Sequence, residues 1–377
     1  MIDLDHNAGG RVRGEVAAAL AAWLAEPHGN PASPHQLGRS AREAIDAARA
    51  AVAALVGAQA SSVVFMSGAT EANNHIVAAT RGHVVTSVLE HPSLTRALAA
   101  SSGREVTALR GDGFGRITSG EVVAALRPDT GLLSVAWASG ETGTIQDIAS
   151  LVAAARATRS GELLIHSDAA QAAGWLPITF QESGIDALTL SGHKLGAPSG
   201  IGALVLSDRL ELPPLLRGGS QEDGRRAGTP NVLGIVGFGV AARLAARERE
   251  ERARQVAREL ALLWELLVAG AAPIERLDPA AGLPGTLAVS FPDLRGDLLV
   301  IALDLEGICV STGPACAAGG AERSPALRAL GLSEASVRGA LRLSLGAPLG
   351  APQIQEVAGR IARVVARARA RAAGRAA

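Results

Sequence analysis

From about residue 40 to residue 240, stretches with helical periodicity alternate with short apolar runs, and this alternation limits the possible folds more than any other feature. The stretch 40–56 places Ile45, Ala48 and Val52 on one helix face, and Gly57 follows as a stop signal. Such an alternation predicts an α/β fold whose mostly parallel sheet is covered by helices, with ligands beyond the carboxyl ends of its strands. The apolar runs of strand length are Val63–Met66, Val84–Val85, Leu132–Trp137, Leu163–Ile165, Ala187–Leu190 and Ala203–Leu206.

After residue 240 the pattern changes to that of a smaller α+β domain. We therefore expect a large domain over 15–240 and a C-terminal domain over 241–377, with 1–14 packed nearby. The Ala/Arg-rich end, Gln355–Ala377, is expected to form an amphipathic helix with a solvated arginine face. The other predicted elements are helices over Ala241–Ala269 and Asp297–Leu305 and strands over Thr286–Phe291, Ile308–Val310 and Leu341–Leu345.

Charge and composition exclude several classes of protein. The 377 residues carry 36 basic and 36 acidic side chains, which is unlike a nucleic-acid-binding protein. No apolar run is long enough for a membrane span, and the acidic N-terminus is unlike a signal peptide, so we expect a cytoplasmic protein. The two cysteines, Cys309 and Cys316, form neither a disulfide framework nor a zinc motif, and no metal is expected.

One basic residue differs from all the others. Of the 36, 35 are arginines and Lys194 is the single lysine, and the chain contains no tyrosine. A codon bias explains the arginines, but it does not explain a retained lysine. An arginine stays charged in a protein, whereas a lysine amine can become neutral and attack a carbonyl carbon.

Four features lie where predicted strands end: the segment Ser67–Glu71, His91, Asp168 and Lys194. Each alone has an ordinary structural explanation as a turn, a helix cap or a surface side chain. Together they match what pyridoxal phosphate needs: an amine for a Schiff base, a carboxylate for the pyridinium nitrogen, an anion cradle and a ring for stacking. We therefore expect a pyridoxal phosphate enzyme.

The chain resembles the cysteine desulfurases of the iron–sulfur-assembly type, which belong to the class V aminotransferases, a family of fold-type I pyridoxal phosphate enzymes. The resemblance extends from Leu4–Ala8 to Arg342–Gly346, nearly the whole chain. Its most specific stretches are Gly29–Ser33, Ser67–Glu71, Ser191–Lys194 and Ser311–Cys316.

This resemblance implies roles at the cofactor. Lys194 would bind the cofactor covalently and later move the proton on the substrate α-carbon. Asp168 would pair with the pyridinium nitrogen, Gln171 would hydrogen-bond the phenolic oxygen, and His91 would stack on the ring as a possible acid–base group. The residues expected to hold the phosphate are Ala69, Thr70, Ser191 and His193, with Thr229 reaching the phosphate of the neighbouring subunit of a homodimer.

It also implies the substrate side of the reaction. Arg342 would bind the carboxylate of L-cysteine through a bidentate contact, and Asn30 is a second candidate for that pocket. Cys316 would be the nucleophile whose thiolate takes the sulfur as a persulfide, leaving alanine and passing sulfur to an acceptor protein. Cys309, between two apolar residues, is expected to be an inert core residue.

The chain departs from the family pattern at several positions. Gly9–Gly10 stands where a threonine pair is usual, and Ser139–Gly140 stands where two asparagines are usual. Pro314 and Ala227 replace residues that are usually serine. Without the asparagine amide at position 140, one hydrogen bond at the cofactor oxygen and substrate carboxylate is missing. Two alternatives therefore stay open: a low-activity, cofactor-binding scaffold protein, and a related selenocysteine lyase or aminotransferase.

Overall fold

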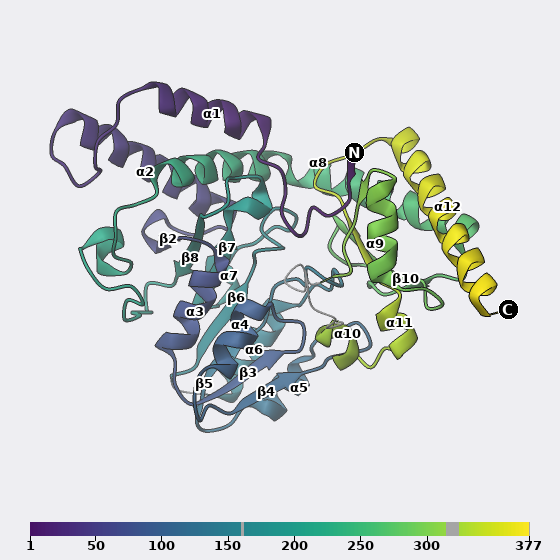
Figure 1. The fold of residues 1–377 in the computed structure, drawn as a ribbon. Coiled ribbons are helices and arrows are strands. Elements are labelled where there is room, and N and C mark those ends of the chain that lie inside the picture. Colours follow the sequence, from purple (N-terminus) through teal and green to yellow (C-terminus); the bar gives the residue numbers. More distant parts are fainter. Residues whose placement is uncertain (160–161, 314–323, 377) are drawn as a thin grey trace.

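The structure is a computed structural model that describes residues 1–159, 162–313 and 324–376. A seven-stranded sheet forms the core of its larger part (Figure 1). Among these strands only β8 runs antiparallel to its neighbours, so the predicted α/β fold with a mostly parallel sheet is confirmed. In spatial order the strands are β2 (Val63–Met66), β8 (Gly202–Leu206), β7 (Ala187–Ser191), β6 (Leu164–Asp168), β5 (Thr130–Ser134), β3 (His83–Ser87) and β4 (Val106–Leu109).

Helices pack around this sheet, as the alternating pattern predicts. The predicted helix at 40–56 is α2, which begins four residues earlier because the His35 ring caps it by accepting a hydrogen bond from Gly38 N at 3.3 Å. Asp147 caps α6 through Ser150 N at 3.2 Å. The helices are α1 (Gly14–Ala25), α2 (Gln36–Leu55), α3 (Ala69–Ala79), α4 (Pro92–Ala99), α5 (Ser119–Ala125), α6 (Ile148–Thr158) and α7 (Phe180–Ser183), with short 3₁₀ turns η1 (Ala60–Ser62), η2 (Gly192–Leu195) and η3 (Gln221–Gly224).

The C-terminal part holds two small sheets and more helices. β10 (Thr286–Ser290) pairs antiparallel with β12 (Ala340–Ser344) and β9 (Glu275–Arg276), while β1 (Ile2–Asp3) pairs parallel with β11 (Ile308–Cys309). The first residues of the chain therefore lie beside residues 308–309. The helices of this part are α9 (Gly296–Leu305), α10 (Pro325–Ala329), α11 (Glu334–Arg338) and α12 (Ala351–Ala376).

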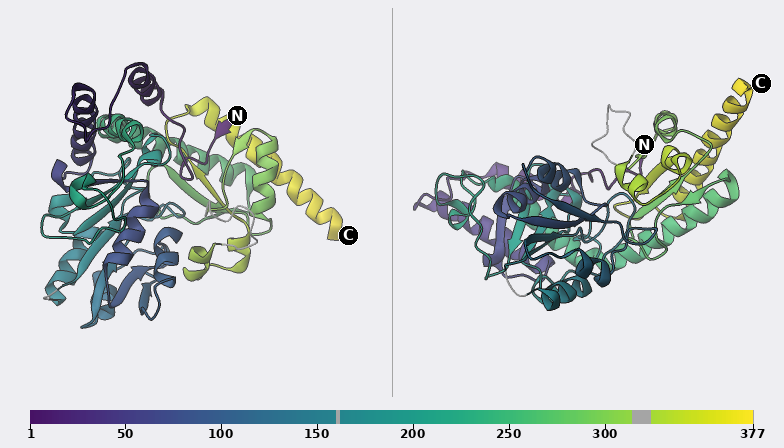
Figure 2. Two further views of the ribbon diagram at one scale, coloured as in Figure 1. Left: turned by 60° about the vertical axis from the view of Figure 1, so that its left-hand side comes forward. Right: turned by 90° about the horizontal axis from the view of Figure 1, so that it is seen from below.

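A single long helix, α8 (Val232–Ala271), joins the two parts (Figures 1 and 2). It begins nine residues before the predicted start at 241, because Asn231 caps it by accepting from Gly234 N at 3.0 Å and Ile235 and Phe238 are buried on its first turns. It packs on α2 at one end and on α12 at the other. In the described part of the chain, no helix is long and apolar enough to cross a membrane.

A buried histidine within the large sheet gives the stability of the fold a pH dependence. The imidazole of His166 contacts Ser134 Oγ at 2.8 Å and Thr189 Oγ1 at 3.0 Å, and burial lowers its pKa to about 4 from the usual 6.5. The unfolded chain therefore binds a proton near pH 6.5 that the folded chain excludes until about pH 4. Stability from this group is complete above pH 6.5 and is lost as the pH falls.

We expect the free energy of unfolding to fall by about 3 kcal/mol from this group between pH 6.5 and pH 4. Urea denaturation at several pH values in this range measures it. His166→Gln, which cannot titrate, should show a shallower dependence than wild type, and equal slopes for the two proteins would contradict the assignment.

Candidate active site

The candidate residues meet at the carboxyl edge of the large sheet. Because β2 and the other parallel strands all point the same way, the segments that follow them lie along one edge. The register places Ser191 beside Gly202 and Gly202 beside Met66, so β7 ends next to the start of α3. Four of the sequence features thus lie along this edge: Ser67–Glu71 after β2, His91 after β3, Asp168 at the end of β6, and Lys194 after β7.

Asp168 is a buried carboxylate that two hydrogen-bond donors hold. Its Oδ1 accepts a hydrogen bond from Ala170 N at 2.9 Å, and its Oδ2 accepts one from Asn73 Nδ2 at 2.7 Å. The residue is 7% exposed, and among the described residues no cationic side chain forms an ion pair with it. A buried charge normally has a partner, so this carboxylate is suited to a cationic ring nitrogen.

Lys194 lies on η2, one turn after β7. Its Nζ donates to the carbonyl oxygens of Asn7 and Ala8, the second at 2.9 Å. The N-terminal segment thus holds the single lysine of the chain at the sheet edge.

Two histidines near Lys194 are neutral at physiological pH. Burial, and then the charge of Lys194, lower the pKa of His193 to about 4, and its Nδ1 contacts Ser191 Oγ at 2.9 Å. His91 is exposed as a whole residue, but the surrounding protein desolvates its imidazole and thereby lowers its pKa. The charge of Asp168 raises this pKa, and the charge of Lys194 lowers it further. His91 Nδ1 also caps α4 by accepting from Ser93 N at 3.1 Å. Both rings are therefore available as uncharged groups.

The N-terminus of α3 can hold an anion. Its N-cap residue, Gly68, supplies no side-chain cap, and a Cβ there would have no atom within 4 Å, so there is open space beside the N-cap of the helix. The nearby Glu71 carboxylate is neutralised by Arg226 at 2.9 Å and accepts from Ser67 N at 2.7 Å. Thr70, the second residue of α3, adds a hydroxyl at this end.

These groups fit pyridoxal phosphate. Asn73, which binds Asp168, lies one turn beyond Ala69, about 6 Å along the helix axis. An aromatic ring with a phosphate arm can bridge that distance, from the start of α3 to the Asp168 carboxylate. The residues at this edge that would hold it are Thr70, His91, Asp168 and Lys194, with Asn73 orienting the carboxylate.

Arg342 on β12 is a buried cation with one unused donor. Its Nη1 donates to Gly140 O at 3.0 Å and to Gly313 O at 2.8 Å, and its Nη2 donates to Asp5 Oδ1 at 2.7 Å. The residue is 5% exposed, and its buried Nε has no hydrogen-bond partner among the described residues. A ligand carboxylate would supply the missing acceptor.

The Gln171 side chain occupies the space that Gly140 leaves. A Cβ at position 140 would lie 2.6 Å from Gln171 Nε2, which donates to Asn7 O at 3.1 Å. An asparagine at position 140 could not coexist with this position of Gln171. The resemblance already assigns the Gln171 amide to the phenolic oxygen of the cofactor, so position 140 still lacks the second amide of the family pattern.

We expect Gly140→Ala to displace Gln171 and to lower the free energy of unfolding by about 1–3 kcal/mol. Gly113→Ala is the matched control, because a Cβ there would have no atom within 4 Å. Urea denaturation of both variants measures the difference. Equal stabilities of the two variants would show that Gln171 does not need this space.

The remaining predicted residues lie elsewhere or outside the described residues. Thr229 is exposed and lines a cavity of about 210 Å³ with Ser67 and Arg226. Asn30 is exposed, and its Oδ1 accepts from Ala32 N at 2.9 Å. Cys316 and Pro314 fall outside the described residues.

Cys309 is half-buried on β11 rather than in the core. Burial, and then the charge of Asp3, raise the pKa of its thiol. A raised pKa keeps the sulfur as a thiol, which agrees with the expectation of an inert residue.

Sequence reasoning missed three polar residues that hold the site together: Asp5, Asn7 and Asn73. Asn73 could have been found, because it lies one helical turn after Ala69 of the predicted phosphate segment. Asp5 and Asn7 gave no such signal, because their partners lie up to 337 residues away in the chain.

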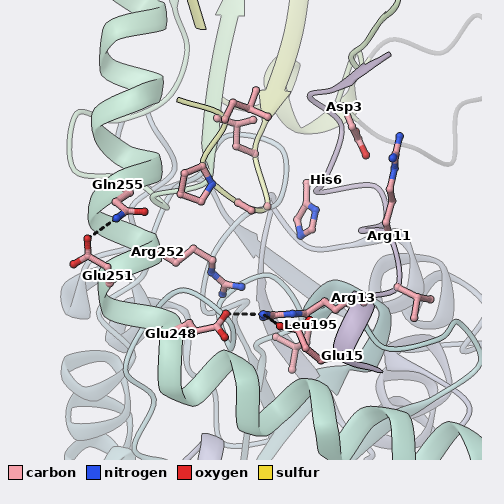
Figure 3. A pocket seen from close by; sticks show the side chains of 18 of the residues that line it. Asp3, His6, Arg11, Arg13, Glu15, Leu195, Glu248, Glu251, Arg252 and Gln255 are labelled. Carbon is pink, nitrogen blue, oxygen red and sulfur yellow. Dashed lines mark hydrogen bonds and ion pairs between the residues drawn. The ribbon is translucent and has the colours of Figure 1, made fainter. Parts of the chain in front are cut away.

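A second cavity, of about 760 Å³, lies beside the N-terminal segment (Figure 3). His6 and Arg252 line it, as does the ion pair of Arg13 with Glu248 at 2.6 Å. Burial, and then the charge of Arg252, lower the pKa of His6 to about 4. The lining includes His6, Leu195 and Gly196 but neither Asn7 nor Lys194.

Comparison with known proteins identifies the family of this chain. The sequence pattern of the family described as aminotransferase class-V matches residues 2–357. A cysteine desulfurase of Trichormus azollae is 38% identical over 354 residues, which are 92% of this chain and 88% of that protein. Among solved structures, a NifS-like protein matches with a TM-score of 0.90 and 29% identity, over 97% of this chain and 99% of its own. A structure described as SspA in complex with cysteine matches with a TM-score of 0.81 and 32% identity, over 92% and 99% of the two chains.

Proposed function

The chain belongs to the aminotransferase class-V family, and we propose that it is a cysteine desulfurase. With pyridoxal phosphate it would remove sulfur from L-cysteine, leave L-alanine and carry the sulfur as a persulfide on Cys316. The observation that carries this proposal is the chain of contacts between an amine and a carboxylate-binding cation. Lys194 donates to Asn7 O, Asn7 donates to Gly140 O, and Gly140 O also accepts from Arg342.

Each residue of the site would have its own role in this reaction. When bound, the cofactor withdraws electrons from the substrate α-carbon, and Asp168 would keep its ring nitrogen protonated. Arg342 would orient the substrate through its carboxylate, using the unpaired Nε. Lys194 Nζ would then take up and return the α-proton, because it lies at the same sheet edge. Neutral His91 and His193 would add no positive charge against the Lys194 ammonium.

Cys316 would receive the sulfur as the carbon–sulfur bond of the substrate breaks. The described residue Gly313, three positions earlier, is held at Arg342 Nη1, and Ser311 pairs with Arg342 in the small sheet. The segment that carries the cysteine therefore starts beside the expected carboxylate of the substrate. This placement supports a thiolate that reaches the substrate sulfur.

A homodimer and a sulfur-acceptor protein complete the proposal. Thr229 is exposed in the single chain, as a residue that serves a neighbouring subunit would be. The Glu222 carboxylate, paired with Arg49 at 2.7 Å, fixes the start of the loop that presents Thr229. The acceptor would be a protein that takes a persulfide sulfur.

The purified protein is expected to be yellow and to release sulfide and alanine in equal amounts from L-cysteine and a thiol reductant. Cys316→Ala should keep the colour and lose sulfide release, because the cofactor site is intact and the nucleophile is gone. Absorbance spectra, sulfide assays and alanine analysis measure these results. A colourless wild type, or colour without sulfide, would overturn the proposal. Colour without sulfide would instead favour a scaffold or an aminotransferase.

A further inference from the structure

Asn7 is buried where the two parts of the chain meet, and its donors bind both of them. Its Nδ2 donates to Gly140 O at 3.0 Å, in the loop after β5, and to Thr286 Oγ1 at 2.8 Å, on β10. Its backbone N–H donates to Ser344 Oγ at 2.9 Å, on β12. The residue is 3% exposed. These three contacts fix the peptide unit that follows Asn7.

That peptide unit faces the lysine. Asn7 O accepts from Lys194 Nζ and from Gln171 Nε2, and Ala8 O accepts from Lys194 Nζ at 2.9 Å. Two neutral carbonyl acceptors stabilise an ammonium group more than a neutral amine. The contacts of the Asn7 side chain therefore determine where the lysine amine lies and how strongly it holds its proton.

We propose that Asn7 is a positioning residue that builds a resting site for the Lys194 ammonium from the carbonyl groups of Asn7 and Ala8. This inference rests on the proposed function, in which Lys194 Nζ becomes an ammonium group each time it takes up the α-proton of the substrate. The resting site returns the amine to one location after each proton transfer. Because Thr286 and Ser344 hold Asn7, the location of the Lys194 amine also depends on the positions of β10 and β12.

The histidines around the lysine do not change charge in the pH range where a lysine titrates, so a change in the titration of Lys194 reports on its carbonyl acceptors. His6 precedes Asn7, His193 precedes Lys194 on η2, and His91 caps α4. The pKa of each of these three is lowered, so they are neutral in the range where a lysine titrates. Asp168 on β6 is the nearby anion, and Asn7 does not contact it.

The test uses the fact that Lys194 is the single lysine of the chain. In the full chain freed of cofactor, an acylating reagent can label only Lys194 and the N-terminal amine, and mass spectrometry separates the two. Asn7→Ala is expected to lower the midpoint of the pH profile for Lys194 labelling by about one unit, a tenfold faster reaction at a fixed pH below the midpoint. Mere loosening of the structure would raise the plateau rate without moving the midpoint.

Thr286 supplies a matched pair of variants. Thr286→Val removes one acceptor of the Asn7 amide and should move the midpoint in the same direction by a smaller amount, while Thr286→Ser keeps the hydroxyl and should match wild type. A folded Asn7→Ala variant with the wild-type midpoint would overturn the proposal. If Asn7→Ala does not fold, a wild-type midpoint in Thr286→Val would overturn it instead. If the midpoints move as expected but wild type makes no sulfide, the positioning role stands and the proposed function fails.

Discussion

Lys194→Arg is expected to abolish both the yellow absorbance and sulfide release. Arginine keeps the positive charge and can still donate to the carbonyl groups of Asn7 and Ala8, so the local fold should survive. A guanidinium group does not lose its proton in a protein, so it can neither bond to a carbonyl carbon nor shuttle the α-proton. Proton transfer alone contributes roughly 10²–10⁴-fold to such rates. No other lysine can replace Lys194, because the chain has only one.

Borohydride reduction provides the decisive measurement for this variant. In wild type, it should fix the mass of the reduced cofactor on the peptide that contains Lys194. In Lys194→Arg that peptide should keep its unmodified mass. Urea denaturation serves as the control for folding. A folded variant that still carries the cofactor covalently would contradict the assignment.

Arg342→Gln is expected to lower kcat/KM for L-cysteine on the order of 100-fold or more, mainly through a higher KM. The change removes the expected carboxylate anchor, and truncating one member of a buried, hydrogen-bonded charge pair costs about 2–5 kcal/mol. It also leaves Asp5 without its partner and Gly313 O without its donor. Steady-state kinetics with L-cysteine measure the effect.

Two further variants separate binding from stability. Arg342→Lys keeps a charge but cannot make the several directed contacts of a guanidinium group, so it should also raise KM. Asp5→Asn keeps Arg342 and removes only the charge of its partner, so it should raise KM far less. A normal KM in Arg342→Gln would show that another group anchors the carboxylate.

The comparison of sequence and structure is most informative at the ends of elements. The strand Val63–Met66 was predicted to the residue, because a short apolar run between turn signals has one register in a buried sheet. Helix α8 was predicted to begin nine residues too late, since Val232–Val240 carries almost no charge and its helical period is hidden. Strand β4 was not predicted, because half of it is exposed at the sheet edge.

At the site, the sequence identified groups that belong to one strand end each. Lys194 was found because a single lysine among 36 basic residues stands out, and Asp168 because it closes an apolar run. The consequence of Gly140 could not be derived, because it depends on Gln171, which is 31 residues away in the chain and adjacent in space. The structure therefore shows which side chain fills the space at position 140, where the second amide of the family pattern is still missing.

The sequence by itself determined the family, the α/β fold and the chemistry-bearing residues of the sheet edge. These depend on local patterns, in which strand, turn and functional group are neighbours in the chain. Only the tertiary structure showed that Asn7 and Asp5 hold Lys194 and Arg342, and that Asn73 orients Asp168. Those contacts join residues between 95 and 337 positions apart, so no local pattern contains them. The packing of α3 on the large sheet decided the contact of Asn73, and the packing of the N-terminal segment between the two parts of the chain decided those of Asn7 and Asp5.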